Sequence, residues 1–264
     1  MDLELAGKTA LITGGSRGIG KAIARHLARE GVAVAIAARG RDALEETAQE
    51  LAQETGQRIV PIQGDTSDDD SVHNMVERSV AELGQLDILV NNAGWVARPS
   101  PTVEELTNEE FFDDVNVKVV GYIRCAREAA PYLKKQGWGR IINISGGSAR
   151  STGSYVHSIR NVSVVALTKN LADELGPQGI NVTCVIPGTI RTERFDEIIE
   201  SRARVRGVSP EEVVQTLVES VSIRRVIDSQ DIANIVTFLA SPKSIAINGD
   251  VVPATGGGSR AIYY

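Results

Sequence analysis

The chain has 264 residues, with 28 Lys and Arg against 34 Asp and Glu, and this net charge of −6 does not favour nucleic-acid binding. Apolar residues make up 42% of the chain, close to the globular average, so a substantial core is expected. Apolar runs are broken before the ~18 residues of a membrane span and the N-terminus has no apolar signal core, which predicts no membrane association and a soluble, cytoplasmic protein.

Short apolar runs alternate with amphipathic segments along the whole chain. In chain order we expect a strand at 9–13, a helix at 20–31, a strand at 32–38, a helix at 41–56, a strand at 58–65, a helix at 67–84, a strand at 86–94, a long helix at about 108–135, a strand at 139–145, a helix at 154–176, a strand at 180–188, a helix around 235–240 and a strand at 250–257. Uniformly apolar strands separated by helices predict a doubly wound parallel sheet of about seven strands in a single domain, residues 1–264, of the Rossmann type. The charged, helical segment at about 189–222 is expected to be an excursion of that domain.

A glycine-rich loop follows the first strand, with the sequence TGGSRGIG from Thr13 to Gly20. Gly14, Gly18 and Gly20 would permit a sharp turn and a close approach of backbone N–H groups to a pyrophosphate at the helix N-terminus. The position of the loop between a buried strand and an amphipathic helix makes dinucleotide binding the favoured interpretation over an ordinary turn.

The end of the second strand indicates which dinucleotide is bound. A carboxylate there would bind the ribose 2′-hydroxyl of NAD, but the strand ends in Ala37 and Ala38, followed by Arg39. Arg17 lies within the glycine loop, and two guanidinium groups suit a 2′-phosphate. NADP is therefore favoured over NAD. In the alternative interpretation, Arg39 and Arg41 are solvated residues at the start of a helix.

The cysteines and histidines do not predict a metal centre. Cys125 and Cys184 lie far apart in apolar segments, which indicates buried free thiols. His26 and His73 lack metal-ligand spacing with a second ligand, and no metal site is expected.

Several motifs together resemble the short-chain dehydrogenase/reductase family, of the single-domain type that includes 3-oxoacyl-carrier-protein reductases. The glycine loop is similar to the family's TGxxxGxG, NNAG at 91–94 to its strand-four motif, and PGTIRT at 187–192 to the segment that contacts the nicotinamide end. The resemblance implies that Asp65 hydrogen-bonds the adenine and that Asn116 holds a proton-relay water. The full set of cofactor-binding residues expected on this basis is Gly14, Ser16, Arg17, Gly18, Ile19, Gly20, Arg39, Asp65, Thr66, Asn92, Ala93, Gly94, Asn161, Pro187, Gly188, Thr189 and Thr192.

The catalytic positions depart from the family pattern, which is Ser followed further along by Tyr-x-x-x-Lys. Counting back through VVALTKNLADELG places His157 at the Tyr position and Asn161 at the Lys position. The strand GRIINIS places Gly146 at the Ser position, with Ser145 before it and Ser148 after it. The resemblance implies that the Tyr is the general acid/base and that the Lys binds ribose and lowers the Tyr pKa.

His157 and Asn161 are four residues apart and share a helix face. A histidine can serve as acid/base near neutral pH, and replacing Lys with neutral Asn161 would spare His157 a neighbouring cation. The other interpretation is a cofactor-binding relic without efficient hydride transfer. Tyr155 could be the donor in a shifted register, but its i+4 partner is Ile159, and Arg160 lies about 140° around the helix.

Residues near these positions carry weaker signals. Ser145, Ser148 and Ser151 could contact a substrate oxygen or be loop residues, and Trp95 and Tyr155 could line a substrate pocket or simply pack. The segment at 191–206 carries Arg191, Arg194, Arg202, Arg204 and Arg206. These arginines could attract an anionic substrate, or they could be a solvated face balanced by neighbouring carboxylates.

The sequence thus predicts NADP-dependent oxidoreduction of a small-molecule carbonyl or alcohol, with Asn116, Ser145, Tyr155, His157 and Asn161 as candidate catalytic residues. One alternative is an inactive dinucleotide-binding homologue with a regulatory or assembly role, and another is a non-redox enzyme that reuses the pocket. The resemblance also implies a homotetramer.

Overall fold

The computed structural model describes residues 1–94 and 101–258. Its centre is a seven-stranded sheet in the order β3-β2-β1-β4-β5-β6-β9, and every pairing is parallel. The chain reverses its direction of winding between β1 and β4, so a crevice is expected at the carboxyl ends of these two strands. The predicted doubly wound fold is confirmed.

The strands are β1 (Thr9–Thr13), β2 (Ala33–Ala38), β3 (Ile59–Gln63), β4 (Ile88–Asn91), β5 (Gly139–Ile144), β6 (Ile180–Pro187) and β9 (Val251–Ala254), with a separate pair formed by β7 (Ile190–Arg191) and β8 (Ile227–Asp228). The α-helices are α1 (Gly18–Arg29), α2 (Arg41–Thr55), α3 (Asp69–Leu83), α4 (Asn108–Val115), α5 (Gly121–Gln136), α6 (Tyr155–Leu175), α7 (Phe195–Arg206), α8 (Pro210–Ser220) and α9 (Ser229–Ala240).

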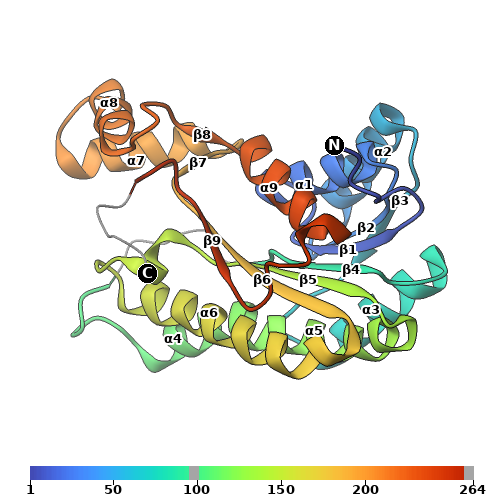
Figure 1. The fold of residues 1–264 in the computed structure, drawn as a ribbon. Helices are drawn as coiled ribbons and strands as arrows, with labels where there is room; N and C mark the ends of the chain where they lie inside the picture. Colours follow the sequence, from blue (N-terminus) through green and yellow to red (C-terminus); the bar gives the residue numbers. More distant parts are fainter. Residues whose placement is uncertain (95–100, 259–264) are drawn as a thin grey trace.

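Helices cover both faces of the sheet. Helices α1, α2 and α9 lie on one face, and α3, α5 and α6 lie on the other (Figure 1). Side chains alternate along each strand, so Ile12 and Ile36 pair across strands in the first core while Leu11 and Ala35 pair in the second. This two-sided burial explains why the strands are apolar throughout.

The long helix predicted at about 108–135 runs without a break from Asn108 to Gln136, but it is not α-helical throughout. A π-helical turn, Asn116–Val120, separates α4 from α5. Thr66, at the end of β3, donates its hydroxyl to the carbonyl of Val117 at 2.9 Å and gives this carbonyl a partner outside the helix. A side chain at Gly121 would meet Thr66 at 2.9 Å, so the chain also approaches β3 closely here. Such local turns are frequent at functional sites.

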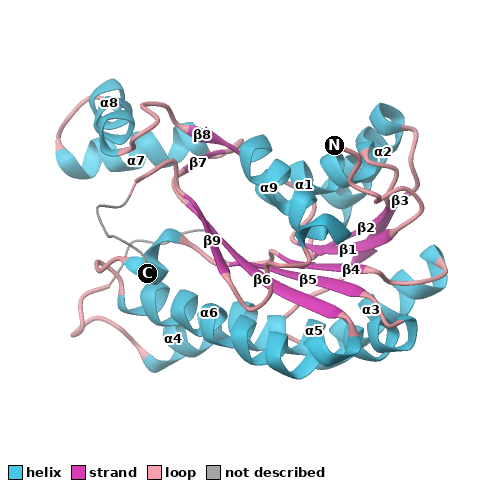
Figure 2. Cartoon of the chain, viewed as in Figure 1, coloured by secondary structure: helices cyan, strands magenta, loops and turns pink. Residues whose placement is uncertain are grey.

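Helices α7 and α8 lie beyond the carboxyl end of β6, joined to the sheet through β7 and β8 (Figure 2). They form a small apolar cluster of their own, with Phe195, Ile199, Ala203 and Val213 buried. These two helices, called the lid below, correspond to the excursion predicted at 189–222. In the described ranges, no helix is long and apolar enough to cross a membrane.

Candidate active site

The site lies where the carboxyl ends of the parallel strands meet. The chain leaves β1 into the glycine loop, β2 into Arg39, β3 into Asp65 and Thr66, and β4 into NNAG. Two cavities open along this edge. A groove of about 460 Å³ runs over β1, β2 and β4, and a cavity of about 560 Å³ lies between the end of β5 and the lid. The groove is lined by residues that include Gly14, Ser16, Arg17, Gly18, Ile19, Arg39, Asp65, Thr66, Asn92, Ala93, Gly94 and Thr192.

The glycine loop is held in a shape that tolerates no larger residue at its last position, Gly20. A Cβ at Gly20 would lie 2.2 Å from the carbonyl oxygen of Gly14. The amide of Asn92 donates to the carbonyls of Thr13 and Gly14, each at 3.1 Å, and so ties the loop to the end of β4. The NNAG motif therefore holds the glycine loop in place through the hydrogen bonds of Asn92.

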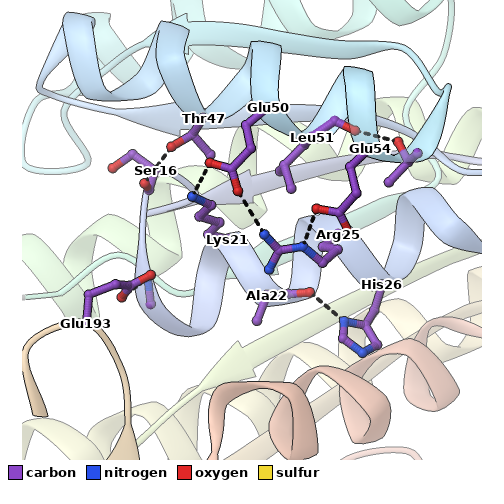
Figure 3. A network of polar contacts seen from close by, with 12 residues as sticks. Ser16, Lys21, Ala22, Arg25, His26, Thr47, Glu50, Leu51, Glu54 and Glu193 are labelled. Atoms are coloured by element: carbon purple, nitrogen blue, oxygen red, sulfur yellow. Dashed lines mark hydrogen bonds and ion pairs between the residues drawn. The ribbon is translucent and has the colours of Figure 1, made fainter.

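The first backbone N–H of α1 already binds an anionic group. Gly18 has a φ of 57° and donates its N–H to the carboxylate of Glu193 at 3.0 Å. Figure 3 shows Glu193 reaching from the segment before the lid to the start of α1, across from Ser16. The carboxylate marks this helix N-terminus as an anion site, and the pyrophosphate of a dinucleotide would fit the same N–H group.

The rim of the groove is basic where a ribose 2′ substituent is expected. Arg17 and Arg39 both line the groove, and β2 ends in Ala37 and Ala38. Asp65, for which the resemblance implies a contact with the adenine, also lines the groove, and one of its carboxylate oxygens accepts hydrogen bonds from the N–H and hydroxyl of Ser67 at 2.9 and 2.7 Å. The residues present thus fit a dinucleotide that carries a 2′-phosphate.

Helix α6 begins where the sequence predicted. The hydroxyl of Ser154 accepts a hydrogen bond from the N–H of His157 at 3.2 Å and caps the helix. The helix buries one stripe that includes Arg160, Asn161 and Val164. Asn161 is only 2% exposed and His157 is half-buried, whereas Tyr155 is 53% exposed. The histidine, not the tyrosine, is therefore on the inward-facing side of the first turns.

Asn161 packs directly against the segment that follows β5. Its amide donates to the hydroxyl of Ser148 at 2.7 Å, and its backbone carbonyl accepts from the hydroxyl of Ser145 at 2.9 Å. A Cβ at Gly146 would lie 2.8 Å from the Asn161 amide nitrogen. A serine at position 146 would have to displace the Asn161 side chain, so the residues at these two positions are linked by packing. The side-chain oxygen of Asn161 is buried without a described partner.

A lysine that the sequence analysis did not single out reaches the same segment from the π-helical turn. Lys118 is 7% exposed and donates to the backbone carbonyl of Ser145 at 3.0 Å. Its Nζ would lie 4.0 Å from a Cβ at Gly94. Burial lowers the pKa of Lys118 to about 7, and the nearby charge of Arg160 acts in the same direction. The only signal for Lys118 in the sequence would have been a charged residue at a helix position that faces the core.

Asn116 does not share the position of Lys118. Its amide donates to the carbonyl of Ser67 at 3.2 Å, and its side-chain oxygen accepts from Arg124 at 2.9 Å. Both hydrogen-bonding ends of the amide are thus engaged with the turn after β3 and with α5. The structure brings Lys118, rather than the side chain of Asn116, to the Ser145–Asn161 contact.

The charges around His157 correct one expectation. Burial, followed by the positive charge of Arg160, lowers the pKa of His157, and Lys118 adds to this effect while Asp114 opposes it. Arg160 is itself buried and donates to both carboxylate oxygens of Asp114 at 2.6 and 2.8 Å. The neutral side chain of Asn161, expected at the Lys position, therefore does not leave His157 without a neighbouring cation, because the π-helical turn and the next turn of α6 each supply one.

The larger cavity joins Ser148 and Ser151 to the lid. Gly188 and Thr189 line it after β6, and Phe195 and Leu217 line it from the lid. Among the arginines that could attract a substrate or form a solvated face, Arg202 lines this cavity, Arg194 lines the groove and pairs with Glu197, and Arg191 lies over the ring of Phe195. Trp95 lies outside the described residues.

Two further expectations concern metals and thiols. Cys125 and Cys184 are free and buried, as predicted. Within residues 1–94 and 101–258, no group of three His, Cys, Asp or Glu side chains is placed to hold a metal ion.

Similar proteins of known family identify the family of this chain. Residues 14–259 match the family profile described as enoyl-(acyl carrier protein) reductase. The chain is 33% identical to the 3-oxoacyl-[acyl-carrier-protein] reductase FabG of Staphylococcus aureus over 252 residues, which cover 95% of this chain and 97% of that protein. The chain belongs to the short-chain dehydrogenase/reductase family and is by family an oxidoreductase.

Other relatives are named for their cofactor. The NADPH-dependent reductase BacG of Bacillus subtilis is 29% identical over 258 residues, covering 97% of this chain and 99% of that protein. The L-sorbose reductase of Gluconobacter frateurii, solved with NADPH and L-sorbose, superposes with a TM-score of 0.93 at 29% identity, covering 99% of this chain and all of that one.

Proposed function

We propose that this protein is an NADPH-dependent reductase of a small carbonyl compound, or in the reverse direction an NADP⁺-dependent alcohol dehydrogenase, in which His157 and Asn161 act at the positions of the family's Tyr and Lys. The observation that carries the cofactor part is the groove, where an anion-binding helix N-terminus lies beside a rim that contains Arg17 and Arg39. Two relatives of similar length, one named as an NADPH-dependent reductase and one solved with NADPH, support the same cofactor.

NADPH, His157 and Ser148 have separate roles in the proposed reaction. NADPH, when bound, supplies the hydride. His157, half-buried beside Arg160, would deliver the proton to the substrate oxygen. Its lowered pKa makes the protonated imidazole a stronger acid, but reduces the fraction of the histidine that is protonated at neutral pH. Ser148, held by Asn161 at the wall of the larger cavity, would bind the substrate oxygen.

A second candidate function is dinucleotide binding without turnover. It is favoured by the packing of Asn161 against Gly146, which leaves no side chain at the position where the family carries its Ser. In that case the protein would regulate or assemble with an active homologue.

Oxidation of NADPH in the presence of a substrate distinguishes the reductase from the dinucleotide-binding protein. NADPH oxidation would be followed with a panel of aldehydes, ketones, sugars and 3-oxoacyl thioesters, for the wild type and for His157→Phe. Oxidation that depends on a substrate and is lost in the variant supports the reductase. Tight NADPH binding without turnover on any member supports the binding protein.

Cofactor choice is tested by dissociation constants. The wild type is expected to bind NADPH more tightly than NADH, because Arg17 and Arg39 would meet the 2′-phosphate. In Arg39→Asp the preference should shrink by roughly ten- to hundredfold, as one charged hydrogen-bonding partner is lost and a like charge is introduced. Arg41→Asp, on the exposed start of α2, is the matched control. A wild-type preference for NADH contradicts the assignment.

A further inference from the structure

Lys118 is a buried cation whose hydrogen-bonding capacity is mostly unused. An ammonium group has three N–H donors. One of them reaches the carbonyl of Ser145 at 3.0 Å, and within the described ranges no carboxylate forms an ion pair with this lysine. The neighbouring Asp114 is engaged with Arg160. Burying an ammonium group in this condition is unfavourable, and acceptor atoms from a ligand would relieve the cost.

The place of Lys118 indicates which ligand would reach it. Its aliphatic chain and Nζ pass beneath the backbone of Gly94, and both Gly94 and the preceding Val117 line the dinucleotide groove. Its single partner, Ser145, is the first residue after β5 and leads to the segment that lines the larger cavity. Lys118 itself lines neither cavity, but it lies directly behind residues that line the groove and bonds to a residue that precedes the wall of the larger cavity.

Asn161 presents the complementary group. Its side-chain oxygen is buried and has no described partner, while its amide nitrogen is fixed by Ser148. Lys118 contacts the carbonyl of Ser145, and Asn161 contacts Ser145 and packs against Gly146. Lys118 and Asn161 thus both hydrogen-bond Ser145, and a vicinal diol, which both accepts and donates, would satisfy the spare N–H donors of the first and the side-chain oxygen of the second.

We propose that Lys118 and Asn161 together bind the ribose hydroxyls at the nicotinamide end of the dinucleotide, with Lys118 supplying from the π-helical turn the cation that α6 lacks. This assignment rests on the proposed dinucleotide binding. It divides between two helices the ribose contacts that the family resemblance implies for one lysine at position 161. The competing explanation is that Lys118 has only a structural role and holds the π-helical turn against the end of β5.

Two ligands separate these explanations. NADPH carries the nicotinamide ribose, whereas adenosine 2′,5′-bisphosphate has the 2′-phosphate end and lacks that ribose. Dissociation constants for both would be measured by calorimetry on wild type, Lys118→Met and Lys169→Met. Lys169 lies on α6, is exposed and pairs with Asp173, so it is the matched control.

Lys118→Met should weaken NADPH by roughly ten- to hundredfold, the loss expected for a hydrogen bond from a charged donor. Its affinity for adenosine 2′,5′-bisphosphate should equal that of the wild type, which also shows that the variant is folded. Equal NADPH affinity in the variant, or parallel loss of both ligands, would overturn the assignment. A wild type that binds neither ligand would instead overturn the dinucleotide function, and this assignment with it.

The pH dependence of NADPH binding distinguishes a ribose contact of Lys118 from a purely structural role, because a structural role would not change it. Wild-type affinity for NADPH, relative to the bisphosphate, should fall as the pH rises above about 7, where Lys118 loses its proton, and should be flat in Lys118→Met. The charged and titratable groups facing Lys118 are Arg160, Asp114, Cys184 and His157. Burial raises the pKa of Cys184 to about 11 and lowers that of His157, so neither titrates in this window. An identical pH profile in the two proteins would count against a ribose contact.

Discussion

His157 is the residue on which the proposed chemistry depends, and its surroundings set the pH range of that chemistry. Burial and the charges of Arg160 and Lys118 lower its pKa below the ordinary value of 6.5. Reduction consumes the protonated form, so the rate of reduction should rise as the pH falls, with its midpoint below 6.5. Alcohol oxidation needs the neutral form and should reach its plateau at lower pH than for an ordinary histidine.

The measurement is the pH–rate profile of kcat/KM for wild type, His157→Phe and Tyr155→Phe. We expect Tyr155→Phe to keep the wild-type profile, since Tyr155 is 53% exposed. If Tyr155→Phe loses activity while His157→Phe keeps it, the register of α6 assigned to the donor is wrong.

The buried Lys118 should also make the stability of the folded protein depend on pH. Its pKa is about 7 in the folded protein against 10.5 when exposed, so between these values the unfolded chain binds more protons than the folded one. Stability from this site is therefore present at high pH and is lost as the pH falls towards 7. Lys118→Met, which carries no charge, should raise the melting temperature most at pH 7 and below, with the gain shrinking towards pH 10.

Thermal unfolding without ligand would be followed at several pH values for Lys118→Met, wild type and Lys169→Met. The exposed Lys169 should show no comparable gain. A Lys118→Met protein that melts below the wild type throughout this range would mean that the buried ammonium stabilises the fold.

At the scale of elements, the segment leading to the lid competes with a ligand for the start of α1. The carboxylate of Glu193 binds the N–H of Gly18, where the anion of a dinucleotide would bind. Glu193→Gln should therefore lower the dissociation constant of NADPH by about two- to fivefold, the scale of an anion at a helix N-terminus. Glu197→Gln, on α7 and paired with Arg194, is the control. Unchanged or weaker NADPH binding in Glu193→Gln would show that the contact does not compete.

At the scale of the whole molecule, an exposed apolar stripe supports the predicted homotetramer. Tyr155, Ile159 and Val162 are about half-exposed and follow one another at helical spacing on the outer face of α6, and Ile123 is exposed on α5. Such a face on a long helix is typical of an interface between subunits.

Sedimentation equilibrium of the wild type at micromolar concentration should give about four times the chain mass of 28.2 kDa. Val162→Glu should shift the population to smaller species, because it places a charge in the proposed interface. Val205→Glu, at an exposed site on α7, should leave the assembly unchanged. A wild type that sediments only as a monomer contradicts the tetramer.

The sequence by itself determined the fold and the groove. The apolar strands, the glycine loop and the NNAG motif carry local signals, because a buried strand must be apolar on both faces and a tight phosphate-binding turn needs glycine. The start of α6 followed from the same logic, since Ser154 caps the helix that carries His157 and Asn161. These features depend on residues that are near one another in the chain.

Only the tertiary structure decided which distant groups meet. Lys118 lies in a segment whose helical pattern looks continuous, and the π-helical turn that directs it towards Ser145 depends on Thr66, at the end of another strand. Glu193 reaches Gly18 across 175 positions of the chain, and Gly146 meets Asn161 between β5 and α6. The pKa of His157 likewise depends on burial and on charges from two helices. Burial and through-space charge arise only when the elements pack, and periodicity along a single chain carries no record of them.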